Sequence, residues 1–135
     1  MSKNREVSRR SGTSISIRET LKKAITELLV LLVLRKRPMY TYEIMREIET
    51  LSRGNIVFNT LYQAIYRLQE FCYIAEKDKK LVDNRVRIYF SITPEGEAYL
   101  EQLIAEYRLF TKTVDQILLI ELSSQTQEGA ETWTT

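Results

Sequence analysis

The chain contains 135 residues, enough for one domain with a hydrophobic core, and its 44% hydrophobic and 28% charged residues are usual for a soluble globular protein. Its longest apolar run extends only from Leu28 to Leu34, whereas a membrane-spanning helix needs roughly 20 such residues, and the polar, basic start of the chain offers no signal peptide. A single Cys leaves no partner for a disulfide, so we expect a cytoplasmic protein that does not associate with a membrane.

The formal net charge of +2 conceals an uneven distribution of charge along the chain. Residues 1–93 carry 18 Lys and Arg against 10 Asp and Glu, whereas residues 94–135 carry 2 against 8. The first part thus has a net charge of +8 and the second a net charge of −6. A basic body indicates a polyanionic partner for that part of the chain, although chance scatter of surface charge is the alternative.

Residues 1–18 are rich in Ser, Arg and Lys and lack periodic apolar positions, so they predict a flexible basic arm. Its cations include Arg9, Arg10 and Arg18. Such an arm either stays in solvent, as chain termini usually do, or contacts DNA phosphates or a minor groove.

Two helices are predicted in the first half of the chain. Residues 19–35 place apolar side chains at helical spacing, and the strongly apolar second half of this segment indicates that most of its surface is buried. Pro38 ends this helix. Residues 41–51 form the second helix, with a buried stripe that includes Ile44 and Ile48.

A third helix is predicted for residues 60–71, with Asn59 as its N-cap, because an Asn side chain can accept hydrogen bonds from the free amides of a first turn. One face of this helix is apolar and belongs to the core. The opposite face is polar and carries Thr60, Gln63 and Arg67.

Two strands, residues 73–77 and 85–93, are predicted to form a hairpin with a polar tip at residues 78–84. The second strand alternates apolar and polar residues strictly. As an alternative, the positive charge of the hairpin only prevents an ordinary edge strand from pairing with strands of other molecules. The cations of the hairpin are Lys77, Lys79, Lys80, Arg85 and Arg87.

A long helix is predicted for residues 94–122. Thr93 is its N-cap, Pro94 occupies the first helical position, and Glu95 favours the positive end of the helix. Apolar residues recur at alternating steps of three and four, which is typical of a coiled-coil seam. These residues are Leu100, Leu103, Tyr107, Phe110, Val114 and Ile117. Residues 123–135 lose this period and are expected to be disordered.

This order of elements predicts a mainly α (α+β) fold, in which residues 19–93 form a winged helix-turn-helix domain and residues 94–122 a dimerisation helix. An α-helix fits the major groove of DNA, where Gln suits adenine and Arg suits guanine or phosphate. Cations on a wing can lie on the backbone or enter the minor groove. The sequence therefore predicts a protein that binds double-stranded DNA.

Other classes of function find little support in the sequence. The chain has no His, no phosphate-binding Gly loop and no nucleophile motif, so we expect no enzyme. One Cys without any His leaves no ligand set for a metal, and no cofactor is expected. For Cys72 we expect a buried packing role rather than a redox switch. The main alternative is a winged helix that binds protein instead of DNA.

Several short motifs between Tyr40 and Gly96 occur together. They are Thr41-Tyr42-Glu43-Ile44, Asn59-Thr60-Leu61-Tyr62-Gln63-Ala64-Ile65, Arg67-Leu68-Gln69-Glu70, Cys72-Tyr73-Ile74, Arg85-Val86-Arg87-Ile88-Tyr89-Phe90 and Thr93-Pro94-Glu95-Gly96. In these motifs the sequence resembles the PadR family of transcriptional regulators, in the form with a single C-terminal helix. It departs from the family pattern at Thr41, Asn59 and Cys72, where the family has Gly, and at Gln63, where the family has Pro.

The resemblance implies that Tyr42, Thr60 and Tyr62 contact the DNA backbone, while the third helix and the wing read the site. It also implies a homodimer built by the first and last helices. The interface residues expected there are Leu21, Ile25, Leu28, Leu100, Leu103, Tyr107, Phe110, Val114 and Ile117. We further expect a palindromic operator and repression. The resemblance also suggests a small apolar or aromatic effector between the dimer helices, lined by Tyr99, Tyr107, Phe110 and Leu residues of the first helix, for which a solid dimer core is the alternative.

Overall fold

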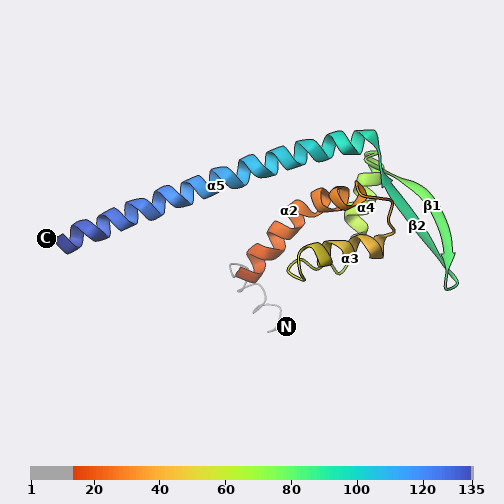
Figure 1. The fold of residues 1–135 in the computed structure, drawn as a ribbon, viewed down its shortest axis with the longest axis horizontal. Coiled ribbons are helices and arrows are strands. Elements are labelled where there is room, and N and C mark those ends of the chain that lie inside the picture. Colours follow the sequence, from red (N-terminus) through yellow and green to blue (C-terminus); the bar gives the residue numbers. More distant parts are fainter. Residues whose placement is uncertain (1–13, 135) are drawn as a thin grey trace, which may run out of the picture. The chain divides into compact units, whose positions relative to one another are not determined.

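The computed structural model describes residues 14–134, in which four helices and a two-stranded antiparallel hairpin follow one another (Figure 1). The described chain divides after Leu100 into two compact units, the second of which begins at Glu101. The elements are α2 (Ser14–Leu34), α3 (Thr41–Leu51), α4 (Tyr62–Glu70), β1 (Ile74–Val82), β2 (Arg85–Ile92) and α5 (Pro94–Thr134). This mainly helical architecture with a wing confirms the predicted fold class.

Helix α2 begins at Ser14, earlier than predicted, so residues 14–18 belong to the helix and not to a basic arm. Arg18 contributes to its packing, because its guanidinium donates a hydrogen bond of 3.1 Å to the carbonyl oxygen of Asn55. The rest of the expected arm lies outside the described residues. The second half of α2 is buried as predicted, with Val30 and Leu31 fully inaccessible.

Helix α3 has the predicted bounds, and its entry is stabilised by Glu43, whose carboxylate accepts a hydrogen bond of 3.3 Å from the Tyr40 amide. Its exit is a Schellman motif, in which the Gly54 amide donates to Glu49 and the Arg53 amide to Thr50. Arg53 and Gly54 both have positive φ, of 53° and 80°. The left-handed turn at this exit therefore begins at Arg53.

Helix α4 begins at Tyr62, and the prediction that it begins at Thr60 with Asn59 as N-cap is wrong. Leu61 occupies the N-cap position, and its side chain makes no capping hydrogen bond. The physical reason is burial: Phe58 and Leu61 are both inserted in the core, which holds the intervening Asn59 and Thr60 in an exposed loop.

The end of α4 is a second Schellman motif, in which the Tyr73 amide donates to Leu68 and the Cys72 amide to Gln69. Cys72 takes the left-handed position with φ 61°. Its side chain is exposed, so the expected packing role in the core is wrong. The Schellman motif places Cys72 in the turn after α4, beyond the helical residues Ile65 and Leu68 that pack in the core.

The hairpin is longer than predicted, because β1 continues through the segment expected to be a polar tip. Pairing extends to Val82 opposite Arg85, and only Asp83 and Asn84 form the turn. Both turn residues have positive φ, of 51° and 63°, which is the geometry of a type I′ turn. The twist of this turn matches that of the strands, so the polar residues before it stay in the ladder.

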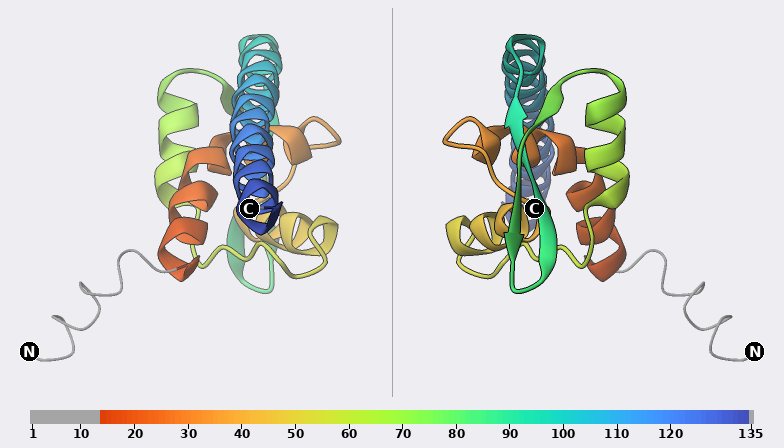
Figure 2. Two further views of the ribbon diagram at one scale, coloured as in Figure 1. Left: turned by 90° about the vertical axis from the view of Figure 1, so that its left-hand side faces the viewer. Right: turned by 90° about the vertical axis from the view of Figure 1, so that its right-hand side faces the viewer.

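The core of the first unit lies where α2, α3, α4 and the base of the hairpin meet (Figure 2). Its fully buried side chains include Leu31, Met39, Ile44, Leu68, Ile74 and Leu100. Met39, in the connection after α2, exchanges two backbone hydrogen bonds with Phe90 of β2 and so fixes the hairpin to the helices. Among the described residues, no helix is long and apolar enough to cross a membrane.

Helix α5 begins at Pro94, and the Thr93 cap is confirmed, since its hydroxyl accepts a hydrogen bond of 3.0 Å from the Gly96 amide. The helix continues to Thr134, so the predicted end of the helix at Leu122 is wrong. The segment after Leu122 contains no Pro and several residues that favour helices, among them Gln, Glu and Ala. After Leu122 the apolar residues no longer recur at helical spacing, so this part of α5 has no apolar face for packing, but its backbone is still helical.

Candidate nucleic-acid interface

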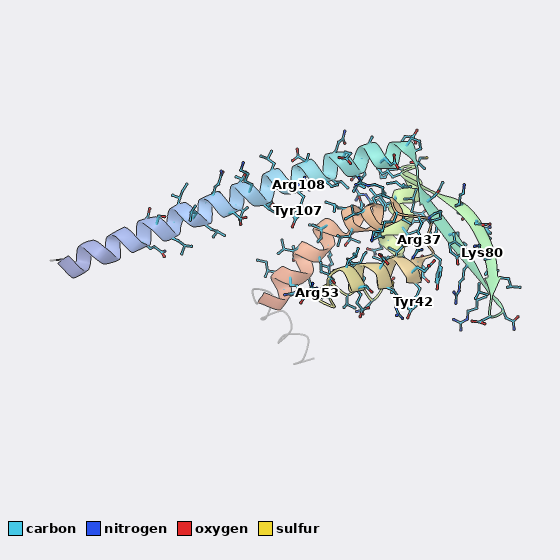
Figure 3. The ribbon with its side chains drawn as sticks, in the orientation of Figure 1. Arg37, Tyr42, Arg53, Lys80, Tyr107 and Arg108 are labelled. Carbon is cyan, nitrogen blue, oxygen red and sulfur yellow. The ribbon has the colours of Figure 1, made fainter. Side chains whose placement is uncertain are left out.

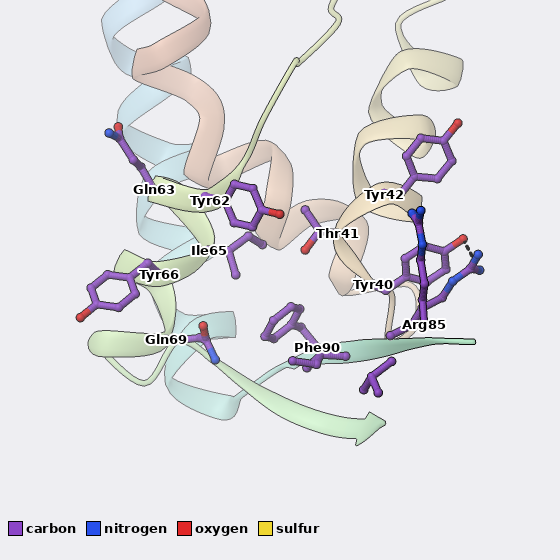
Figure 4. Close-up of a pocket in the computed structure, with 13 residues that line it drawn as sticks. Tyr40, Thr41, Tyr42, Tyr62, Gln63, Ile65, Tyr66, Gln69, Arg85 and Phe90 are labelled. Atoms are coloured by element: carbon purple, nitrogen blue, oxygen red, sulfur yellow. Dashed lines mark hydrogen bonds between the residues drawn. The ribbon is translucent and has the colours of Figure 1, made fainter. Parts of the chain in front are cut away.

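A groove of about 970 Å³ opens in the first unit between the start of α3, one side of α4 and strand β2 (Figure 4). Five residues predicted to bind DNA line this groove together, although they are far apart in the sequence. They are Tyr42, Tyr62, Gln63, Arg85 and Arg87. The other residues that line it are Tyr40, Thr41, Ile65, Tyr66, Gln69, Val86, Ile88 and Phe90.

Helix α4 contributes neutral side chains to the groove. Tyr62, Tyr66 and Gln69 are spaced at i, i+4 and i+7, so they follow one side of the helix, and Gln63 lies beside them at the rim. Tyr62 and Tyr66 are 78% and 71% exposed, far more than a packing aromatic residue would be. Tyr66 and Gln69 were not among the residues predicted to bind DNA. Their helical spacing from Tyr62 is a signal in the sequence that could have identified them.

Arg67 lies outside the groove, which corrects the predicted polar face of this helix. Its Nε is 3.1 Å from a carboxylate oxygen of Glu27 in α2, and its guanidinium lies 5.8 Å from the centre of the Phe71 ring. The other Glu27 oxygen accepts a hydrogen bond of 3.2 Å from the Tyr99 hydroxyl. The guanidinium is thus directed toward α2, while the Arg67 side chain as a whole is 65% exposed.

Tyr99 completes this cluster of Glu27, Arg67 and Tyr99. Its ring is stacked on that of Tyr73, with centroids 4.1 Å apart and planes inclined by 10°. Burial raises the pKa of Tyr99, and the neighbouring Glu27 carboxylate raises it further, because both disfavour a phenolate. The cluster therefore connects α4, α2 and the first turns of α5 through a neutral phenol.

Helix α3 adds a cation that the sequence did not single out. The Arg46 guanidinium donates a hydrogen bond of 3.1 Å to the Tyr42 hydroxyl and lies 5.7 Å from the centre of the same ring. The hydrogen bond to Tyr42 raises the pKa of Arg46, so its charge is retained. Arg46, Glu49 and Arg53 line a shallow hollow next to Tyr42, and Figure 3 labels Tyr42 on α3 and Arg53 in the turn after this helix. The i+4 spacing from Tyr42 is the signal for Arg46.

Two of the wing cations are held on aromatic rings. The Arg87 guanidinium donates a hydrogen bond of 2.8 Å to the Tyr40 hydroxyl and lies 4.5 Å from the centre of that ring. The Lys80 ammonium, on the adjacent strand, lies 4.9 Å from the centre of the Tyr89 ring. The Tyr40 and Tyr89 rings meet edge to face, with centroids 5.4 Å apart. These contacts position positive charge beside the groove before any partner is bound.

The remaining predicted residues differ in their placement. Asn59 and Thr60 are exposed in the loop directly before α4, and the Thr60 hydroxyl accepts a hydrogen bond of 3.4 Å from the Tyr62 amide. Lys77 is exposed at a bulge in β1, where the register shifts between Glu76 and Asp78. Lys79 is exposed near the turn, with its ammonium 3.8 Å from the Glu76 carboxylate.

The residues predicted at a dimer interface are not equally accessible. In the first unit, Leu21 is exposed and Ile25 and Leu28 are half-buried, whereas Leu100 is completely buried in the core and is not available to a second chain. In the second unit, Leu103 is half-buried and four residues along one side of the helix are exposed. These four are Tyr107, Phe110, Val114 and Ile117.

Three helices followed by a basic two-stranded wing, with an exposed helix face beside that wing, define a winged helix-turn-helix protein. A family model described as the transcriptional regulator PadR-like family matches residues 30–102. The chain therefore belongs to this family, and it is a DNA-binding transcriptional regulator and not an enzyme.

Solved structures show the same fold. A transcriptional regulator from Clostridium thermocellum is 28% identical, with a TM-score of 0.67 over 72% of this chain and 96% of that chain. A PadR family regulator from Eggerthella lenta is 27% identical, with a TM-score of 0.66 over 76% and 89%. A PadR family regulator from Clostridium difficile is 26% identical, with a TM-score of 0.57 over 70% and 98%. No curated protein sequence matches this chain closely enough for comparison.

Proposed function

We propose that this protein is a homodimeric repressor that binds a palindromic operator, with α4 of each chain in the major groove and the wing on the neighbouring backbone or in the minor groove. The observation that carries the proposal is the groove, which joins Tyr42, Tyr62 and Gln63 with Arg85 and Arg87. Tyrosine hydroxyls and guanidinium groups suit phosphate oxygens, and a protruding helix suits the base edges. Residues 19–93 supply DNA binding and α5 supplies dimerisation.

The charges around the groove support a nucleic-acid partner over a protein partner. Arg85 and Arg87 line the groove, and Lys80 lies on the adjacent strand of the wing. Arg46 lies next to Tyr42 at the start of α3. These cations gather on the side of the groove opposite α4, because Arg87 contacts Tyr40 and the Tyr40 ring is stacked on that of Tyr42, with centroids 6.5 Å apart. A cluster of cations beside the helix suits a phosphate backbone.

A mobility shift on the DNA upstream of the protein's own gene tests this proposal, with the wild-type protein and an Arg85→Ala, Arg87→Ala variant compared over a range of salt concentrations. If both side chains neutralise phosphates, the slope of log affinity against log salt becomes shallower by about 0.9 for each phosphate that the variant leaves unneutralised. Arg67→Ala is the matched control, because Arg67 is paired with Glu27 outside the groove. A wild-type protein that binds neither this fragment nor random DNA at low salt would instead support a protein-binding winged helix.

We also propose that a small apolar or aromatic effector binds between the dimer helices and relieves repression. The exposed Tyr107 and Phe110 are suitable lining residues. Tyr99 is less suitable, because its ring is stacked on Tyr73 and its hydroxyl is bonded to Glu27. A thermal-shift screen of aromatic compounds, followed by release of bound operator, tests the proposal. The absence of any compound that does both would favour a solid dimer core.

A further inference from the structure

The first turn of α4 presents one side chain suited to reading a base pair. Gln63 is exposed at the rim of the groove, and Figure 4 shows its amide projecting away from the ring of Tyr62. In helix-turn-helix proteins the N-terminal residues of the recognition helix contact the base edges. Gln63 is the second residue of α4 and so occupies that part of the helix. Its amide offers a donor and an acceptor together, which is the pair that the N7 and N6 atoms of adenine require.

The competing reader on α4 is Arg67, which suits guanine and whose side chain is 65% exposed. Arg67 is the only Lys or Arg between Tyr62 and Glu70, and its Nε is 3.1 Å from Glu27. Glu27 is half-buried and its carboxylate contacts Arg67 and the Tyr99 hydroxyl. If Arg67 turned toward DNA, the carboxylate would keep only its hydrogen bond with Tyr99. Glu70, which could in principle accept from cytosine, lies in the last turn of the helix, far from the base-contacting end.

We propose that Gln63 specifies an adenine in each half of the operator, so that the base pair facing the first turn of α4 is A·T. This inference rests on the proposed function, because it assumes that α4 lies in the major groove. It assigns base selection on α4 to Gln63, whereas Arg67 pairs with Glu27 of α2. The surrounding cations supply affinity without sequence preference.

Selection of duplexes from a random double-stranded library identifies the site preferred by the wild-type protein. The same selection is then made with Gln63→Ala, Gln63→Arg and Arg67→Ala. We expect a symmetric pair of adenines in the wild-type site, no preference at that position for Gln63→Ala, and guanine for Gln63→Arg. Arg67→Ala should keep the adenine, since its side chain is outside the groove.

Fluorescence anisotropy on the selected duplex gives the magnitude. Replacing the specified adenine by 7-deazaadenine removes the N7 acceptor. Replacing the A·T pair by G·C removes the adenine N6 donor, so that a donor and an acceptor no longer occur together on the purine. The second change should weaken wild-type binding by roughly 5- to 150-fold and should leave Gln63→Ala binding unchanged. Circular dichroism and equal binding to random DNA at low salt establish that the variant is folded.

The outcomes separate this inference from the proposed function. If Gln63→Ala retains the wild-type base preference while binding DNA, the assignment to Gln63 is overturned and the DNA-binding function stands. A wild-type site with G·C at the corresponding position also overturns it. If the wild-type protein binds no duplex at low salt, the proposed function and the inference are both overturned.

Discussion

At the scale of single residues, Gly96 shows why a short motif has its composition. A β-carbon built on Gly96 would overlap the carbonyl oxygen of Tyr73 and press on the side chain of Ile92. The same Tyr73 oxygen accepts a hydrogen bond of 3.0 Å from the Thr93 amide. The Thr-x-x-Gly step thus combines a helix cap with a close approach of α5 to the backbone before β1.

We therefore expect Gly96→Ala to lower the free energy of unfolding by about 1–3 kcal/mol or more, because the obstruction is backbone and cannot move aside. Gly54→Ala is the matched control. Gly54 has no neighbour within 4 Å of its β-carbon position, so only its φ of 80° matters and the expected loss is about 1–2 kcal/mol. Urea unfolding of both variants measures the difference. A Gly96→Ala protein as stable as the wild type would contradict the close contact.

Tyr99 gives a prediction about pH. Burial and the Glu27 carboxylate raise its pKa, so the folded protein holds the phenol proton more tightly than the unfolded chain does. The stability gained in this way is fully present below the ordinary tyrosine pKa of about 10 and is lost as the pH rises through the folded-state value. The melting temperature, measured between neutral pH and pH 11, should fall at the alkaline end, and it should fall less in Tyr99→Phe than in the wild type. Identical pH profiles would argue against this role of Tyr99.

At the scale of elements, the end of α4 contains a residue in an unfavourable conformation. Cys72 has φ 61° at the position of a Schellman motif that Gly usually occupies. Because its side chain is exposed, replacing it removes no core contact. Cys72→Gly should raise the free energy of unfolding by about 1 kcal/mol, and Cys72→Ala, which keeps the β-carbon, should not. Chemical denaturation of the two variants makes the comparison.

The turn of the wing depends on the same backbone property. Asp83 and Asn84 both have positive φ, and their type I′ turn keeps the register from Val82 opposite Arg85 to Lys80 opposite Arg87. Asn84→Gly should preserve this register, whereas Asn84→Val should destabilise the hairpin by about 1–2 kcal/mol, since a β-branched residue resists the left-handed region. Amide hydrogen exchange of the wing measures the effect. Equal protection in both variants would contradict the proposed dependence on the turn.

At the scale of the whole molecule, the second unit leaves a row of large apolar side chains exposed along α5. Phe110 is 68% exposed, and Tyr107, Val114 and Ile117 continue the row at alternating steps of three and four. This spacing is that of a helix which packs against another helix. It supports the proposed homodimer.

If α5 dimerises through this row, Phe110→Glu should weaken self-association by roughly tenfold or more, because a carboxylate would be buried without a partner. Affinity for a two-half-site operator should fall with it. Lys112→Glu is the matched control, since it introduces the same acidic side chain at an exposed position outside the row. Analytical ultracentrifugation measures the association state. Dimers of unchanged strength in Phe110→Glu would exclude this row as the interface.

The sequence by itself determined the order of the elements, most of the buried stripes and the starting points of α3 and α5. These features depend on local periodicity, on caps such as Thr93, and on Pro, all of which act within a few residues. The groove was partly predictable for the same reason, because Gln63 and Arg85 belong to exposed faces whatever else packs nearby. The polar Asp83-Asn84 pair marks the turn of the hairpin, and β1 continues up to it.

Only the tertiary structure decided where side chains point when two elements compete for them. Arg67 has the spacing of a base-reading residue, but Glu27 of α2 lies within 3.1 Å and holds it on the other side of α4. Leu100 has the spacing of a dimer seam, but it fills the core. Asn59 has the chemistry of a cap, but the burial of Phe58 and Leu61 moves the helix start beyond it. The spacing of residues in the sequence shows which faces of a helix or strand are polar or apolar. The packing of segments that are distant in the sequence decides which side chains each face contacts.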